Sequence, residues 1–164
     1  MDKELSRILF KKNKIKTPKY FLLHTSYEGV LREKMKNKNI KFPIVIKPIN
    51  EGSSLGVYIC KNKKQFNRNY NKLKNQYNQI LIEEYIPGKE IQVAVMGNKA
   101  LGAIELVPKR EFYDYVAKYS FNAKTKHIMP APLIQTKYKE VLHLARKAHE
   151  LLRCRGITDR KSVV

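Results

Sequence analysis

The chain has 164 residues, of which 43% are hydrophobic and 10% are aromatic, so it contains enough apolar material for a folded core. Its 34 Lys and Arg residues against 14 Asp and Glu residues give a formal net charge of +20, which favours anionic partners. No apolar run approaches the length of a membrane span and no secretory pattern opens the chain, so we expect a cytoplasmic protein without a membrane partner.

Hydrophobic spacing in the first half predicts alternating helices and strands. Apolar residues recur at helical spacing in residues 4–13, and helical patterns also cover about 26–36 and 64–75. Short apolar runs predict four strands, at residues 20–23, 43–47, 57–60 and 80–83. We interpret residues 1–84 as a first α/β lobe.

The second half begins with a predicted hairpin. Residues 90–96 and 100–106 flank the turn Gly97-Asn98, and a long polar loop follows them. A helix is predicted over residues 137–152, and His143 and His149 fall away from its apolar stripe, so we expect both histidines to be exposed. Cys60 and Cys154 have neither C-x-x-C spacing nor a histidine partner, so both are interpreted as core thiols.

The most informative segment is residues 42–57, FPIVIKPINEGSSLGV. A predicted buried strand ends in Lys47, and the turn that follows it in the sequence contains Gly52, Ser53, Ser54 and Gly56. Glycines let the backbone approach a ligand, serine hydroxyls and N–H groups donate to anionic oxygens, and the ammonium supplies charge, so this pattern suits a phosphate. An ordinary tight turn with a solvated lysine is the alternative, and the G-x-x-x-x-G-K-[ST] spacing of a Walker A loop does not occur.

Residues 47–57, KPINEGSSLGV, resemble the signature of D-alanine–D-alanine ligases, which are members of the ATP-grasp superfamily. Four further segments follow the order of that family: MDK at 1–3, ILIEEYIPGKE at 80–90, FYDYVAKY at 112–119 closed by PA at 130–131, and CRG at 154–156. The resemblance covers nearly the whole chain. It implies a partial ATP-grasp fold of the α/β (α+β) class, with a first ATP-binding lobe at 1–84 and an incomplete second lobe at 85–164.

The resemblance implies that ATP phosphorylates one D-alanine to an acyl phosphate, which the amine of a second D-alanine attacks, for peptidoglycan precursor synthesis. Lys3 and Lys47 would then contact the phosphates of ATP, and Glu90 would contact its ribose. The residues that the resemblance assigns to nucleotide binding are Lys3, Lys47, Glu51, Gly52, Ser53, Ser54, Glu83, Glu84, Ile86, Glu90 and Lys118, with Glu83 on the adenine side.

A mobile loop at residues 112–119 is also implied by the resemblance. Its Lys118 would close over the γ-phosphate, and Tyr119 would hydrogen-bond Ser53, which links this loop to the phosphate loop. Such a closed site would exclude the water that hydrolyses an acyl phosphate. The implied catalytic residues are therefore Ser53, Lys118 and Tyr119.

The two ends of the chain depart from the family pattern. The N-terminal substrate domain of the family has no counterpart here, and after Gly156 the expected Arg, Asp, Glu and Asn of the magnesium site give way to Asp159 and Arg160. We therefore expect a truncated ligase with no metal ligands in this chain, whose Mg2+ ligands would lie beyond its C-terminus. The chain alone is then expected not to turn over.

Two alternatives to an active ligase stay open. The chain could be a non-catalytic, nucleotide-binding remnant of the ligase, or a basic nucleic-acid-binding module. Its lysines are dispersed among asparagines without an aromatic platform or a recognition helix, so no nucleic-acid partner is expected. The expected partners are ATP and D-alanine, and the resemblance adds that family members are often homodimers.

Overall fold

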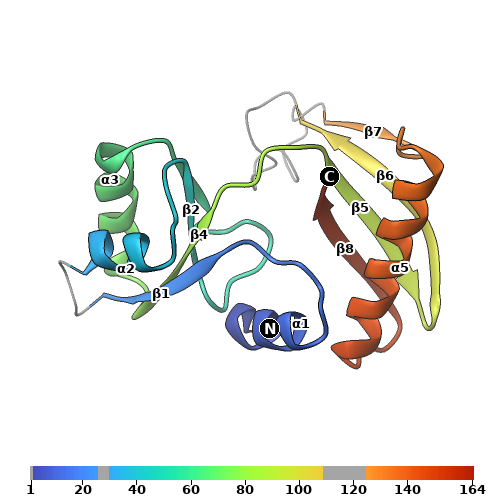
Figure 1. Ribbon diagram of the computed structural model, residues 1–164, viewed down its shortest axis with the longest axis horizontal. Helices are drawn as coiled ribbons and strands as arrows, with labels where there is room; N and C mark the ends of the chain where they lie inside the picture. Colours follow the sequence, from blue (N-terminus) through green and yellow to red (C-terminus); the bar gives the residue numbers. More distant parts are fainter. Residues whose placement is uncertain (1, 26–29, 109–124) are drawn as a thin grey trace. The chain divides into compact units, whose positions relative to one another are not determined.

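The computed structural model describes residues 2–25, 30–108 and 125–164, and the chain divides into two compact units (Figure 1). The first unit comprises Met1–Arg7 and Thr17–Ile86, and the second comprises Ile8–Lys16 and Pro87–Val164. The boundary predicted between residues 84 and 85 divides the two lobes of the ATP-grasp fold that the resemblance implies, and it stays a prediction. Within the described ranges, no helix has the length and apolar character needed to cross a membrane.

The first unit is a four-stranded antiparallel sheet of order β1-β4-β2-β3, with helices α2 and α3. Alternation along the strands divides their side chains between two faces. Ile46 of β2 and Ile82 of β4 are paired in register and fully buried in the core beneath α3. The bounds are β1 Tyr20–His24, α2 Leu31–Asn37, β2 Ile44–Pro48, β3 Tyr58–Cys60, α3 Lys63–Lys74 and β4 Gln79–Glu84.

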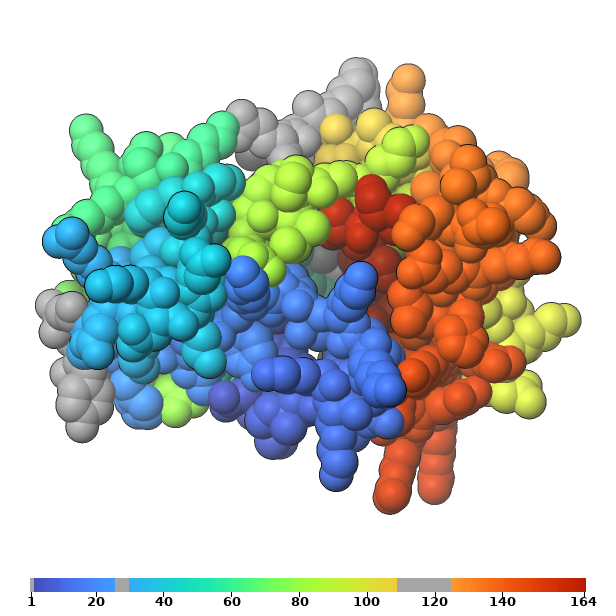
Figure 2. Space-filling view, viewed as in Figure 1, coloured from blue at the N-terminus to red at the C-terminus, as the bar shows by residue number. Residues whose placement is uncertain are grey.

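Helices α2 and α3 differ in how many of their side chains are buried. Helix α3 buries Phe66, Tyr70 and Leu73, and the side chain of Asn62 caps its start by accepting from the Gln65 N–H at 3.0 Å. Helix α2 has no fully buried residue, and Figure 2 shows its side chains, in light blue, on the surface. It begins at Leu31, later than predicted, and residues 26–29 of the predicted helix lie outside the described residues.

The second unit is another antiparallel sheet, of order β7-β6-β5-β8, with helix α5 packed on it. The predicted hairpin around Gly97-Asn98 is confirmed, because Met96 pairs with Lys99 across the turn. Helix α1 belongs to this unit from Ile8 onward. The bounds are α1 Lys3–Lys12, β5 Glu90–Met96, β6 Lys99–Val107, β7 Lys126–Ile128, α5 Gln135–Leu151 and β8 Ile157–Val163.

The predicted α/β (α+β) class is confirmed, and two side-chain predictions are wrong. His149 is buried, at 5% exposure, because α5 packs on β8 as well as on β5 and β6, and the Nδ1 of His149 lies 2.7 Å from the hydroxyl of Thr158 on β8. Cys154 is half-buried, because it follows the end of α5 instead of lying in a strand. The predictions of an exposed His143 and a buried Cys60 are confirmed.

The conformation of Gly56 yields a stability prediction. Its φ is +66°, and a Cβ added there would lie 2.9 Å from the Cγ of Pro48. We expect Gly56→Ala to lower the free energy of unfolding by about 1–3 kcal/mol, because alanine is strained in this backbone region and its methyl group collides. Gly52→Ala is the matched control, since nothing lies within 4 Å of a Cβ there. Urea unfolding that gave both variants the same stability would contradict this prediction.

Candidate functional site

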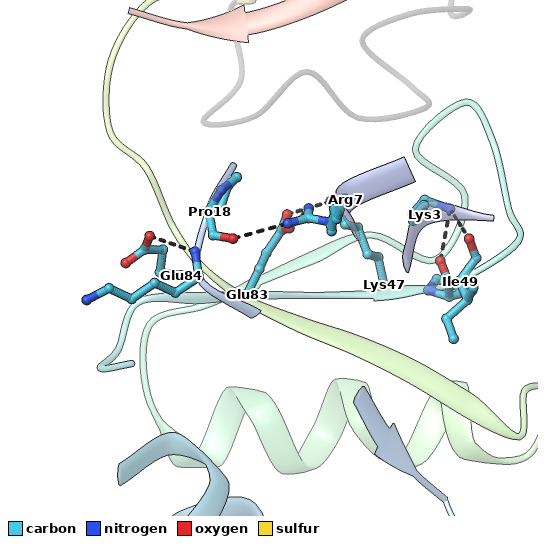
Figure 3. Close-up of polar contacts among 9 residues, drawn as sticks. Lys3, Arg7, Pro18, Lys47, Ile49, Glu83 and Glu84 are labelled. Atoms are coloured by element: carbon cyan, nitrogen blue, oxygen red, sulfur yellow. Dashed lines mark hydrogen bonds and ion pairs between the residues drawn. The ribbon is translucent and has the colours of Figure 1, made fainter. Parts of the chain in front are cut away.

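The centre of the candidate site is the carboxylate of Glu83, whose side chain is 8% exposed (Figure 3). Oε1 accepts from the Nζ of Lys47 at 2.5 Å, and Oε2 accepts from the Nη2 of Arg7. Strand register explains the first pair: Val45 is paired with Glu83, and Lys47 is two residues along β2, so both charged side chains leave the sheet on the face opposite α3.

Arg7 brings helix α1 to this face of the first unit. Its Nη1 donates to the carbonyl of Pro18 at 3.3 Å, and its guanidinium carbon lies 4.9 Å from the centre of the Tyr20 ring. Tyr20 is paired with Glu83 in register, so the ring and the carboxylate share a face of the sheet. The guanidinium is therefore fixed by an ion pair, a hydrogen bond and an aromatic face.

Lys3 holds the segment that follows β2. Its Nζ donates to the carbonyls of Pro48 and Ile49, each at 2.9 Å, and to the carbonyl of Glu51. An ammonium has three N–H donors, so these carbonyls occupy all of them. Burial lowers the pKa of Lys3, and the positive charge of Lys47 lowers it further, while the carboxylate of Glu51 acts in the opposite direction.

Residues 51–56, which we call the phosphate loop, have an unusual backbone. Ser53 and Ser54 have φ of 50° and 62°, in the left-handed region that costs a side-chain-bearing residue roughly 1–2 kcal/mol. The Leu55 N–H donates to the Gly52 carbonyl at 2.9 Å, which closes a tight turn. Gly52 is exposed with open space around it. Such strain persists where the surroundings impose it, and it is frequent at functional sites.

The charges around this loop do not balance. Among the residues that the structure describes, the cations that act on Lys3 are Lys47 and Arg7, and the carboxylates that act on it are those of Glu51 and Glu83. The cluster therefore keeps an excess of one positive charge beside an open backbone turn. Partly buried positive charge next to free space attracts an anion strongly, because solvent screens it less than at an exposed site.

The structure brings four of the sequence-predicted residues together, namely Lys3, Lys47, Glu51 and Glu83. Glu84 lies on the opposite face of β4, half-buried, and its Oε1 accepts from the Lys19 N–H at 2.8 Å. Ile86 is 39% exposed after the end of β4.

Three further predicted residues lie elsewhere. Glu90 begins β5 in the second unit, and Lys118 and Tyr119 lie outside the described residues.

Sequence reasoning missed Arg7. An arginine in an amphipathic helix carries no motif, and its partner Glu83 lies 76 residues away. One local signal existed, because Arg7 is four residues after Lys3 and so lies on the same side of α1. A second cation at that spacing after Lys3, which is predicted to contact phosphate, indicates a basic helix face.

The described residues do not fit a magnesium site. Residues 2–25, 30–108 and 125–164 contain no group of three or more His, Cys, Asp or Glu side chains placed to hold a metal ion. Asp159 on β8 is engaged with the amide of Gln92 at 2.6 Å and with the Nζ of Lys161 at 3.1 Å. A magnesium ion requires several oxygen ligands, and a carboxylate already paired with a lysine does not supply them.

Comparisons with known proteins agree on one family. The family described as "D-ala D-ala ligase C-terminus" matches residues 9–160. A D-alanine–D-alanine ligase of Pelagibacter ubique (strain HTCC1062) is 53% identical, with 96% of this chain and 51% of the relative covered. One of Wolbachia pipientis wMel is 40% identical, with 96% and 48% covered. The chain spans about half the length of the curated relatives it matches.

Solved structures with this fold come from the same kind of enzyme. A D-alanine–D-alanine ligase from Bacillus anthracis superposes with a TM-score of 0.82 at 28% identity, over 99% of this chain and 52% of that one. The structure of that ligase in complex with ATP has a TM-score of 0.79 at 22% identity, with 99% and 50% covered. The VanG D-Ala:D-Ser ligase from Enterococcus faecalis has a TM-score of 0.83 at 25% identity, with 99% and 48% covered.

The Glu83 cluster yields a second stability prediction. We expect Glu83→Gln to lower the free energy of unfolding by about 3–5 kcal/mol, because it leaves the cations of Lys47 and Arg7 partly buried without their carboxylate. Glu84→Gln is the control one residue away, and it should cost less than about 1 kcal/mol, because Glu84 accepts one backbone hydrogen bond and pairs with no cation in the described contacts. Equal urea midpoints for the two variants would refute this role of Glu83.

Proposed function

The chain belongs to the D-alanine–D-alanine ligase family, and from that premise we propose that its first unit holds the triphosphate of ATP at the phosphate loop. The observation that carries this proposal is the excess positive charge of Lys3, Arg7 and Lys47 beside the open turn at Gly52. The ATP complex of the Bacillus anthracis ligase, which has the same fold, supports the same ligand.

Each residue of the first unit has a distinct task in this proposal. Lys47 donates to phosphate oxygens at the tip of β2, and Glu83 and Arg7 keep its ammonium in place. Lys3 adds its charge and orders the loop through three carbonyls, and it binds a phosphate directly by exchanging one carbonyl oxygen for a phosphate oxygen. The N–H and hydroxyl groups of Ser53 donate to the same anion.

The remaining predicted residues are proposed to serve the nucleoside and the substrates. The adenine side that was predicted for Glu83 passes to Glu84 and Ile86 in this proposal, because Lys47 and Arg7 engage the Glu83 carboxylate. Glu90 accepts from the ribose hydroxyls. Lys118 closes over the γ-phosphate, and Tyr119 joins Ser53 by a hydrogen bond that excludes water from the acyl phosphate. The segment after β4 is suited to border a base, because its backbone continues a buried strand into an exposed turn.

The reaction that we propose for the whole protein is ATP-dependent ligation of two D-alanines in the cytoplasm, for peptidoglycan synthesis. The γ-phosphoryl group of ATP passes to a carboxylate oxygen of one D-alanine, and ADP leaves. The amine of the second D-alanine attacks the carbonyl carbon of this acyl phosphate and loses a proton, and inorganic phosphate leaves with the former carboxylate oxygen. Little covalent chemistry falls to side chains in such a reaction. This chain's residues therefore contribute by positioning the reactants and neutralising the charge on the transferring oxygens.

Lys47→Ala tests the nucleotide site. We expect weak ATP binding by the wild-type chain and a further loss of about 1.5–3 kcal/mol in the variant, roughly 10- to 150-fold in Kd, because a charge-assisted contact disappears. Isothermal titration calorimetry measures both affinities. Lys64→Ala removes an exposed lysine of α3 and serves as the control for net charge. Identical titrations of wild type and Lys47→Ala would overturn the assignment of Lys47.

A chimera tests the reaction. Residues 1–164 would replace the matched half of the Pelagibacter ubique ligase, and the product with ATP, D-alanine and D-lactate would be identified by mass spectrometry. We expect D-alanyl-D-alanine and little ester, because Tyr119 resembles the loop residue of ligases that use an amine acceptor. Lys118→Ala in the chimera should lower turnover at least tenfold. Mainly depsipeptide, or no D-alanine-dependent phosphate release, would contradict the proposed substrate.

A further inference from the structure

A cavity of about 530 Å³ lies between the phosphate loop and the end of α3. Glu51, Leu55 and Gly56 of the loop line one side of the cavity. The end of α3 and the turn that follows it, up to Tyr77, line the other side. The loop touches α3 closely near Gly56, where an added Cβ would lie 3.1 Å from the Cδ2 of Leu73. Glu51, at the start of the loop, therefore borders open space, whereas Gly56, at its end, is packed against Pro48 and Leu73.

One side chain bridges this space. The hydroxyl of Tyr77 donates to Oε1 of Glu51 at 3.2 Å. Tyr77 itself is anchored, because its N–H donates to the carbonyl of Leu73 at 2.9 Å directly after α3. Burial raises the pKa of Tyr77, and the Glu51 carboxylate raises it further, so the hydroxyl keeps its proton and remains a donor at neutral pH.

Glu51 is thereby held at two atoms. Its carbonyl accepts from the ammonium of Lys3, and its carboxylate accepts from Tyr77. The residues that directly follow, Ser53 and Ser54, have positive φ and depend on their surroundings to stay there. Fixing Glu51 therefore fixes the point from which the strained part of the loop starts.

The hydrogen bond also determines where a negative charge points. A carboxylate in a loop that binds phosphates opposes binding if it turns toward them, since like charges repel. The contact with Tyr77 keeps the carboxylate of Glu51 on the α3 side, at the wall of the cavity.

We propose that Tyr77 is a positioning residue of the phosphate loop, which orients the Glu51 carboxylate away from bound phosphates. The inference rests on the proposed function of the loop. It adds a residue that belongs to none of the motifs, acting on the ligand only through Glu51. The proposal predicts a selective effect: binding of the polyphosphate part of a nucleotide depends on Tyr77, and binding of the nucleoside part does not.

Tyr77→Phe tests the proposal with inorganic tripolyphosphate and adenosine as separate probes, titrated by calorimetry into the 164-residue chain. We expect the variant to bind tripolyphosphate about tenfold more weakly and adenosine within about twofold of wild type, because only the loop is disturbed. Tyr58→Phe is the matched control, since Tyr58 lines the same cavity without contacting Glu51 in the described hydrogen bonds. Urea unfolding of every variant checks that it is folded.

A second variant separates orientation of charge from general damage. In Glu51→Gln no negative charge can turn toward the phosphates, so adding Tyr77→Phe to it should weaken tripolyphosphate binding by less than about threefold. A full tenfold loss in that double variant, equal losses for adenosine and tripolyphosphate, or unchanged tripolyphosphate binding by Tyr77→Phe would each overturn the role of Tyr77. A wild-type chain that binds no tripolyphosphate would instead overturn the proposed function itself.

Discussion

The first unit is organised around the carboxylate of Glu83. Through its two oxygens it joins strand β4 to Lys47 of β2 and to Arg7 of α1, three elements that are distant in sequence. A buried ion pair adds little net stability, because desolvation of both partners offsets their attraction. Its effect here is geometric: the start of α1 lies where Arg7 reaches this carboxylate, and in that position Lys3 reaches the carbonyls of Pro48 and Ile49.

An incomplete charge balance connects this arrangement with binding. In the described part of the chain, three cations lie close together with two carboxylates, and this arrangement has an electrostatic cost that an anion relieves. Any ligand that binds the folded state alone also stabilises it, in proportion to the logarithm of its concentration over Kd. Binding and stability in this unit are therefore linked through the same side chains.

What the sequence predicted and what it missed follow from the range of the interactions. Lys47 and the phosphate loop are contiguous, so their chemistry can be read from one short motif, and the long helices and the hairpin follow from hydrophobic period. Arg7 and Tyr77 act on partners 76 and 26 residues away, which no local pattern reveals. His149 was misjudged because α5 also packs on strand β8, whose sequence, ITDRKSV, is too polar to show a core-facing pattern. Lys118 and Tyr119 stay predictions.

Ser53 and Ser54 of the phosphate loop, both in the left-handed backbone region, are positions at which stability and ligand binding favour different residues. Glycine at position 53 or 54 would adopt the same φ without steric penalty, so backbone strain by itself favours glycine. Glycine, however, would remove a hydroxyl that can donate to an anion. Selection for thermal stability alone would therefore favour glycine at these positions, and selection for ligand binding would keep the strained serines. Mutational tolerance at these two positions thus depends on which property is under selection.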